Sequence, residues 1–183
     1  MFTNSPRLIL ISGPVGVGKT TVAQELSALL VTNSVAHTFV DLDALTHTYP
    51  RSSDDPFGQT LALRNLQAVW DNAQAHNPRL LLIARVIETE ATARKIAESV
   101  TIDGYTLVQL SAGNETLLER VRTRETGAGR EWHEARAIEL SRSLSEADIA
   151  DHVIETDHLD PAEVAEVLLR NLNLAQSVET DRL

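Results

Sequence analysis

The sequence has no cysteine, a single methionine and few aromatic residues, which make up 4% of its 183 positions. Without thiols there is no disulfide framework and no thiolate metal site, so zinc would need histidine and carboxylate ligands alone. The six histidines show no spacing typical of a metal site. A chain without cysteine is compatible with a reducing compartment, and we expect a cytoplasmic protein.

Long hydrophobic runs and positive charge are also scarce. No apolar segment approaches the ~20 residues that span a bilayer, so we expect no membrane partner. Acidic residues outnumber basic ones by 26 to 16, and the net charge of −10 repels nucleic acid unless a local basic patch overrides it. A nucleic-acid partner is therefore disfavoured.

What remains is the composition of a globular domain, with 43% hydrophobic residues. The length suits one domain with a substantial core, which we place at residues 1–175. Residues 176–183 are polar, and we expect them to form a flexible tail. Monomer and homodimer are both open.

Residues 13–20 read Gly-Pro-Val-Gly-Val-Gly-Lys-Thr and fit the pattern of a phosphate-binding loop. They follow an apolar run and precede an amphipathic one, which is the strand, loop and helix context that the motif requires. Glycines there let successive backbone N–H groups surround a phosphate. An ordinary glycine-rich turn would not explain their spacing. The residues predicted to contact ATP are Gly13, Val15, Gly16, Val17, Gly18, Lys19, Thr20 and Thr21.

Two side chains of this loop have specific roles in the prediction. Lys19 would neutralise the β- and γ-phosphates, and the Thr20 hydroxyl would bind Mg²⁺. The N-terminus of the following helix adds a favourable partial charge.

Apolar runs alternate with helical patterns along the chain. The predicted strands are Arg7–Ser12, His37–Asp41, Arg79–Ile87, Thr106–Ser111 and His152–Glu155. The predicted helices cover residues 19–30, 61–76, 91–100, 115–124, 131–144 and 161–174. Five short strands that alternate with helices predict an α/β fold, with a parallel sheet covered on both faces.

Two segments interrupt this alternation. Residues 46–59 are rich in proline, serine, aspartate and glycine, which is typical of a loop, and long loops in compact domains are often functional. Residues 125–132 contain two glycines between helical stretches that carry arginines. This composition suits a mobile flap.

Asp41 is the last residue of the second predicted strand, and Asp43 lies two positions after it. If the strand continues, alternation places both side chains on the same side, at the sheet edge where ligands of parallel sheets collect. One carboxylate near Mg²⁺ and one near an acceptor hydroxyl is the minimum that a small-molecule kinase needs. The alternative is that Asp43 only caps the following turn.

Four arginines lie within eleven residues of this acidic chain, at positions 120, 122, 124 and 130. Such a cluster suits a phosphate clamp, because guanidinium groups can close over the phosphates of ATP with a flap. The alternative is a solvated helix face on which the arginines pair with Glu119 and Glu125.

Arg85 interrupts an apolar run that otherwise reads as a central strand. A charge there must pair or face a ligand, so either an anionic acceptor group or an ion pair with Asp41 or Glu88 would explain it. Trp70 and Trp132 fit the core better than a substrate site.

Together these residues resemble the P-loop small-molecule kinases, and within them the group of chloramphenicol phosphotransferase-like, adenylylsulfate, gluconate and shikimate kinases. The resemblance covers about residues 7–172 and is strongest at the phosphate loop. It implies a five-stranded parallel sheet in the order 2-3-1-4-5, with an arginine-bearing lid at about residues 125–132.

The resemblance also implies residue roles. Asp41 matches the acceptor base, Arg120 matches the arginine near adenine, and Arg124 or Arg130 matches the lid arginine. One departure concerns the metal-supporting acid after the third strand. That acid is missing here unless Glu88 or Asp41 takes its place.

The sequence therefore predicts a Mg²⁺-requiring kinase that transfers phosphate from ATP to a small hydroxylated or anionic metabolite. Its predicted catalytic residues are Lys19, Asp41, Asp43, Arg124 and Arg130, and its predicted metal-site residues are Thr20 and Asp41. A nucleotide-hydrolysing switch is the competing class. A kinase for nucleic-acid ends is a third, which the negative charge opposes.

Overall fold

The computed structural model describes residues 5–127 and 129–175. The predicted tail at 176–183 lies outside these residues, as does position 128 within the predicted lid. Five parallel strands form one sheet in the order β2-β3-β1-β4-β5, as predicted. The strands are β1 Arg7–Ser12, β2 His37–Asp41, β3 Leu80–Ala84, β4 Thr106–Ser111 and β5 His152–Glu155.

Burial explains this order. Every residue of β3 is buried, and so is β1 from Leu8 to Ser12, because neighbouring strands and two helix layers cover them. The edge strands β2 and β5 keep more exposed positions. Four strands have their predicted bounds, but β3 ends at Ala84 rather than at Ile87.

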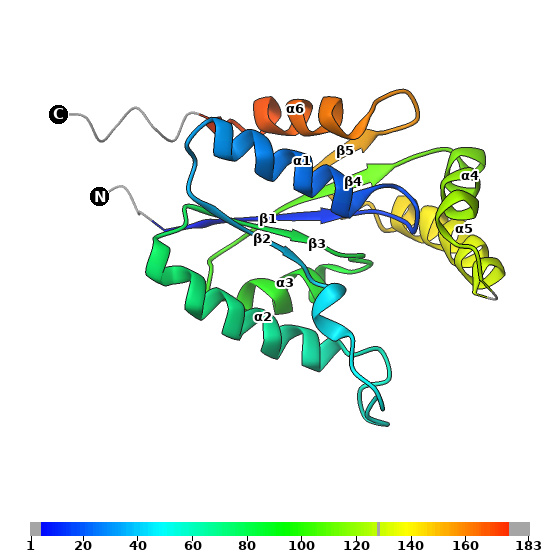
Figure 1. Cartoon of the computed structure of the whole chain (residues 1–183), viewed down its shortest axis with the longest axis horizontal. Helices are drawn as coiled ribbons and strands as arrows, with labels where there is room; N and C mark the ends of the chain where they lie inside the picture. Colours follow the sequence, from blue (N-terminus) through cyan, green and yellow to red (C-terminus); the bar gives the residue numbers. More distant parts are fainter. Residues whose placement is uncertain (1–4, 128, 176–183) are drawn as a thin grey trace.

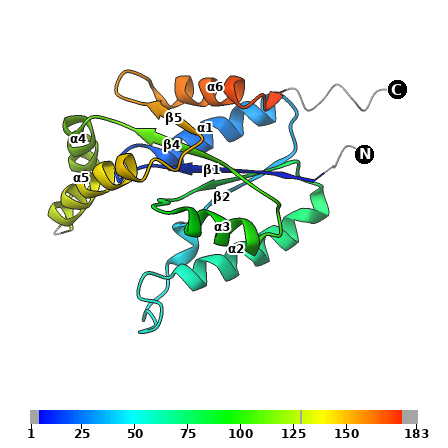
Figure 2. The ribbon, with the colours of Figure 1, turned by 180° about the vertical axis from the view of Figure 1, so that it is seen from behind.

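Helices cover both faces of the sheet, again as predicted (Figure 1, Figure 2). α1 (Lys19–Thr32) and α6 (Pro161–Asn171) lie on one face, while α2 (Gln59–Ala73) and α3 (Glu90–Ser99) lie on the other. The alternation within β1 divides the core accordingly. Ile9 and Ile11 pack in the α1 and α6 layer, whereas Leu8 and Leu10 pack in the α2 and α3 layer.

Four further helices complete the fold. α4 (Asn114–Arg124) and α5 (Arg130–Ala147) project beyond the carboxyl ends of the strands, and the loop after the short helix η1 (Ala44–Thr46) projects at the same end (Figure 1). A second short helix, η2 (Gln74–His76), follows α2. Among the described residues, no helix is long and apolar enough to cross a membrane.

Candidate functional site

The phosphate-loop residues join β1 to α1 at the carboxyl edge of the sheet. Gly13, Gly16 and Gly18 have φ angles of 146°, 84° and 101°, in the region that favours glycine. A Cβ on Gly13 would lie 2.5 Å from the carbonyl oxygen of Leu110, and one on Gly16 would lie 2.8 Å from a methyl of Val121. The loop therefore requires glycine at 13 and 16 both for backbone conformation and for packing.

The ammonium group of Lys19 is held inside this loop. Its Nζ donates hydrogen bonds to the carbonyl oxygens of Gly13 and Pro14, both at 3.0 Å. Burial lowers the pKa of Lys19 to about 8, with the charges of Asp43 and Asp41 opposing this shift and that of Arg124 adding to it. An anion beside Nζ would favour the charged form, so the loop is suited to a phosphate.

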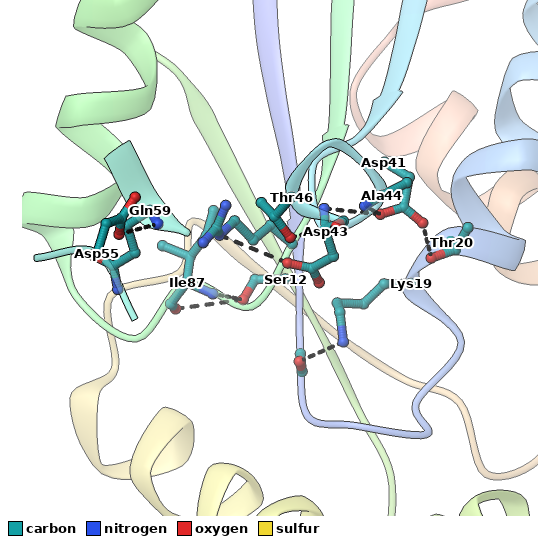
Figure 3. Close-up of polar contacts among 12 residues, drawn as sticks. Ser12, Lys19, Thr20, Asp41, Asp43, Ala44, Thr46, Asp55, Gln59 and Ile87 are labelled. Carbon is teal, nitrogen blue, oxygen red and sulfur yellow. Dashed lines mark hydrogen bonds and ion pairs between the residues drawn. The ribbon is translucent and has the colours of Figure 1, made fainter. Parts of the chain in front are cut away.

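The hydroxyl of Thr20 points to the end of β2 (Figure 3). Thr20 Oγ1 donates a hydrogen bond to Asp41 Oδ2 at 2.8 Å. The other oxygen, Asp41 Oδ1, accepts from the backbone N–H groups of Asp43 and Ala44 at 3.1 and 3.3 Å. The carboxylate is therefore fixed, and together with the hydroxyl it forms a pair of oxygen ligands of the kind that Mg²⁺ prefers.

Asp43 lies outside β2, because the strand ends at Asp41 and the chain turns into η1. The strand does not continue to Asp43, so the condition for placing both acids on the same side of one strand is not met. Asp43 is the N-cap residue of η1, but its side chain makes no capping hydrogen bond. Asp41 makes the capping bonds instead, while the side chain of Asp43 makes none. The side chain of Asp43 is 60% exposed, and its Oδ1 lies 3.9 Å from Arg85 Nε.

Arg120 reaches from α4 to the phosphate loop and to the segment after β5. It donates to Thr156 Oγ1 at 2.9 Å, to the Thr156 carbonyl at 2.8 Å and to the Val17 carbonyl at 3.3 Å. A cavity of about 290 Å³ lies beside it, between the loop and the start of α6. This is where the resemblance places adenine.

A second cavity, of about 550 Å³, lies over the phosphate loop, and we call it the cleft. It brings Lys19 and Thr20 of the phosphate loop together with Asp41 and Asp43, which lie more than 20 positions later in the chain. Arg124 lines both the cleft and the cavity beside Arg120.

Several lining residues of the cleft were not predicted: His47, Val86, Glu125, Trp132 and His133. Trp132 is 63% exposed, so its prediction as a core residue was wrong. Trp70, at 2% exposure, is in the core as predicted. A signal for Trp132 was available, since it closely follows the two glycines at 127 and 129, in the first turn of the helix that begins at Arg130.

The predicted flap is a short connection between α4 and α5, and its last three predicted residues already belong to α5. Arg124 Nε lies 2.9 Å from Glu125 at the cleft. Arg130 Nε faces Glu134 at 3.6 Å, and Arg130 is not among the residues that line the cleft. The structure therefore brings Arg124, but not Arg130, to the phosphate loop.

Glu88 does not join the metal-site oxygens. Its carboxylate lies 2.6 Å from Arg136 of α5, which also pairs with Glu139 at 2.9 Å. Among the described residues that line the cleft, Asp41 is the only acid that forms a hydrogen bond with Thr20.

The sheet order, the glycine-dependent loop and its lysine and threonine define a P-loop protein with the fold of the small-molecule kinases. The model of the AAA domain family AAA_18 matches residues 9–148, more than half of the chain, and the chain belongs to this family. The predicted resemblance is thus confirmed. Curated proteins give no match to this sequence.

Solved structures agree on the fold. The tunicamycin resistance protein of Deinococcus radiodurans is 21% identical, with a TM-score of 0.63 over 91% of this chain and 95% of that one. Shikimate kinase of Acinetobacter baumannii, in complex with shikimate, is 20% identical, with a TM-score of 0.59 over 95% and 97%. A gluconokinase of Sinorhizobium meliloti 1021 is 17% identical, with a TM-score of 0.55 over 93% and 98%.

Proposed function

We propose that this protein is an ATP-dependent, Mg²⁺-requiring kinase that phosphorylates a hydroxyl group of a small metabolite. The observation that carries the proposal is that Lys19, Thr20, Asp41 and Asp43 line one cleft at the carboxyl edge of the sheet. Phosphoryl transfer depends mostly on positioning and on neutralising charge. These four side chains supply both.

The nucleotide would lie across the two cavities, with its base beside Arg120 and its phosphates in the loop. Lys19 Nζ now bonds two carbonyl oxygens and can turn to the β- and γ-phosphates. Arg124 lines both cavities, so it can approach the transferring group from the lid side.

Thr20 and Asp41 would hold the metal, because their oxygens lie 2.8 Å apart and the carboxylate is fixed by two backbone N–H groups. Mg²⁺ held there would neutralise charge on the phosphates. If Asp41 holds the metal, its carboxylate is not free to act as the acceptor base, which is the role that the resemblance implied for it.

Asp43 is therefore our candidate for the base that takes the proton of the acceptor hydroxyl. Its carboxylate is 60% exposed, it lines the cleft, and its side chain accepts no hydrogen bond from any described residue. The acceptor hydroxyl would give its proton to Asp43 as its oxygen bonds to the γ-phosphorus. The bond from that phosphorus to the bridging oxygen breaks, and ADP leaves.

We further propose a cytoplasmic enzyme, monomeric or homodimeric, that acts on small molecules rather than on nucleic-acid ends. The net charge of −10 supports the choice of substrate, since it repels a polyanion.

A coupled assay of ADP release, run with and without a panel of small hydroxylated compounds, tests the kinase. We expect slow release without acceptor and a stimulation of at least about tenfold with the true acceptor. ADP release that no acceptor stimulates would contradict the kinase and support a nucleotide-hydrolysing switch.

A further inference from the structure

Arg85 follows β3 and is nearly buried, with only 13% of its side chain exposed. A guanidinium has five N–H donors, and burying them without acceptors is costly. In the described part of the chain, the guanidinium of Arg85 makes no hydrogen bond, and its one ion pair is the 3.9 Å approach to Asp43. Neither Asp41 nor Glu88 pairs with it, so its donors are available to a ligand.

The backbone around Arg85 is fixed. Arg85 N donates to the carbonyl oxygen of Ile11 at 3.1 Å. Two residues later, the backbone N–H of Ile87 donates to Ser12 Oγ at 2.9 Å (Figure 3). Both acceptors lie at the end of β1, so these hydrogen bonds hold the backbone of Arg85 beside the phosphate loop.

Arg85 also lines a separate cavity of about 170 Å³ between α2 and α3, which we call the α2–α3 cavity. Its polar lining residues are Gln59, Arg85, Thr89, Thr92 and Lys95, and none of the described residues that line it is acidic. At about 30 Å³ per water molecule, this volume has room for a carboxylate or a phosphate group.

Lys95 is an exposed residue, and it is the second cation that lines this cavity. Lys19 and Lys95 are the only two lysines of the chain, and the other basic residues are arginines. One lysine lies in the phosphate loop and the other lines the α2–α3 cavity. The cavity thus holds two cations and no acid in a protein of net charge −10.

Two helices add favourable partial charge, because Gln59 begins α2 and Thr89 precedes α3. Asp55 is the other carboxylate near Arg85. Its carboxylate accepts hydrogen bonds from the backbone N–H groups of Gln59 and Leu61 at 2.7 and 3.0 Å. The bond from Leu61 is the main reason that the pKa of Asp55 is lowered, and the charge of Arg85 makes the smallest contribution. Asp55 is therefore bound to α2, and no hydrogen bond or ion pair joins it to Arg85 among the described residues.

We propose that the α2–α3 cavity binds an anionic group of the acceptor, a carboxylate or a phosphate, through Arg85 and Lys95. This inference rests on the proposed kinase function. Since Arg85 adjoins Asp43, one small molecule can hold its anionic group in the cavity and its hydroxyl at Asp43. The acceptor is then both hydroxylated and anionic.

Calorimetric titration of the full chain tests the site, with the phosphate loop first saturated by Mg²⁺ and a non-hydrolysable ATP analogue. The probes are inorganic phosphate in one arm and acetate in the other, which distinguishes the two anion types. Arg85→Met and Lys95→Met remove the two cations. Arg94→Met is the matched control, because Arg94 lies on α3 with 66% of its side chain exposed and pairs with Glu90.

We expect the wild type and Arg94→Met to bind at least one probe with equal affinity, and Arg85→Met to weaken it at least about tenfold. Affinity for the ATP analogue should not change. Equal anion binding by wild type and Arg85→Met, or no binding of either probe by the wild type, would overturn the site while leaving the kinase intact.

Lysine modification gives a second readout. With the phosphate loop filled, bound phosphate should slow the acetylation of Lys95 in the wild type but not in Arg85→Met, as read by mass spectrometry. Equal protection in both would also count against the site. Failure of the ATP analogue to bind is a different result, which would overturn the kinase itself.

Discussion

The hydroxyl of Thr20 and the carboxylate of Asp41 are joined by a 2.8 Å hydrogen bond across 21 sequence positions. The bond connects the start of α1 to the end of β2 and places two oxygens at the mouth of the phosphate loop. Asp43, two residues on, makes no such bond and faces the cleft. The two aspartates therefore have separable roles.

Asp41→Asn should weaken the binding of ATP in the presence of Mg²⁺ at least about tenfold, because an amide replaces a charged oxygen ligand. Binding measured in EDTA should change little. Calorimetric titration with and without Mg²⁺ measures this difference. An equal loss in both conditions would mean that the side chain supports the loop rather than the metal.

Asp43→Asn makes the same chemical change as Asp41→Asn at the second aspartate of the cleft. We expect it to keep the affinity for Mg²⁺–ATP and to lower acceptor phosphorylation about 100-fold, as the loss of a general base does. The measurement is the initial rate of phosphoryl transfer with the true acceptor. Undiminished transfer would return the acceptor role to Asp41.

The predicted lid offers a comparison between two arginines. Arg124 lines the cleft near Lys19, whereas Arg130 faces Glu134 on α5. Arg124→Ala should lower kcat at least about tenfold with little change in nucleotide affinity, since its contact forms with the transferring group. Arg130→Ala should stay near the wild type. If kcat falls only in Arg130→Ala, the lid closes by a larger movement than the present geometry indicates.

Much of the fold could be predicted from local sequence. The phosphate loop is a continuous motif, and hydrophobic periodicity set the bounds of four strands. The end of β3 was missed because Val86 and Ile87 resume the apolar run after Arg85. Only the hydrogen bonds to Ile11 and Ser12 show that this segment leaves the strand.

The candidate site was less predictable, because it depends on contacts between distant segments. Nothing near Asp43 in the sequence shows that Asp41 takes the capping bonds and leaves Asp43 exposed. Likewise, Trp132 reaches the cleft only because α5 starts at Arg130 and folds back on α4. Helix propensity gives no information on that packing.

The two tryptophans give a fluorescence test of the cleft. Trp132 is 63% exposed and lines it, whereas Trp70 is 2% exposed in the core. Binding of Mg²⁺ and a non-hydrolysable ATP analogue should change the emission of the wild type and of Trp70→Phe. The change should be lost in Trp132→Phe, because closure of the lid alters the surroundings of that indole. A signal that survives in Trp132→Phe would mean that the core reports the binding instead.

Lys19 makes the stability of the protein depend on pH in an unusual direction. Its pKa is lowered from 10.5 to about 8 in the folded chain, chiefly by burial, so folding is less favourable when this amine is charged. The penalty is complete below pH 8, shrinks as the pH rises toward 10.5 and vanishes above it.

Lys19→Met removes this penalty along with the charge that the phosphates need. Near pH 7, its Tm without nucleotide should exceed that of the wild type by roughly 2–4 °C for each kcal/mol of penalty removed. The difference should narrow near pH 10, where the wild-type amine is neutral.

ATP affinity should fall at least about tenfold, since a buried partner of two phosphates is lost. Differential scanning calorimetry at both pH values and titration with Mg²⁺–ATP provide the measurements, with Arg94→Met as the control for the loss of an exposed cation. A Lys19→Met protein less stable than the wild type at pH 7 would show that the two carbonyl hydrogen bonds of Lys19 outweigh the cost of burying its charge.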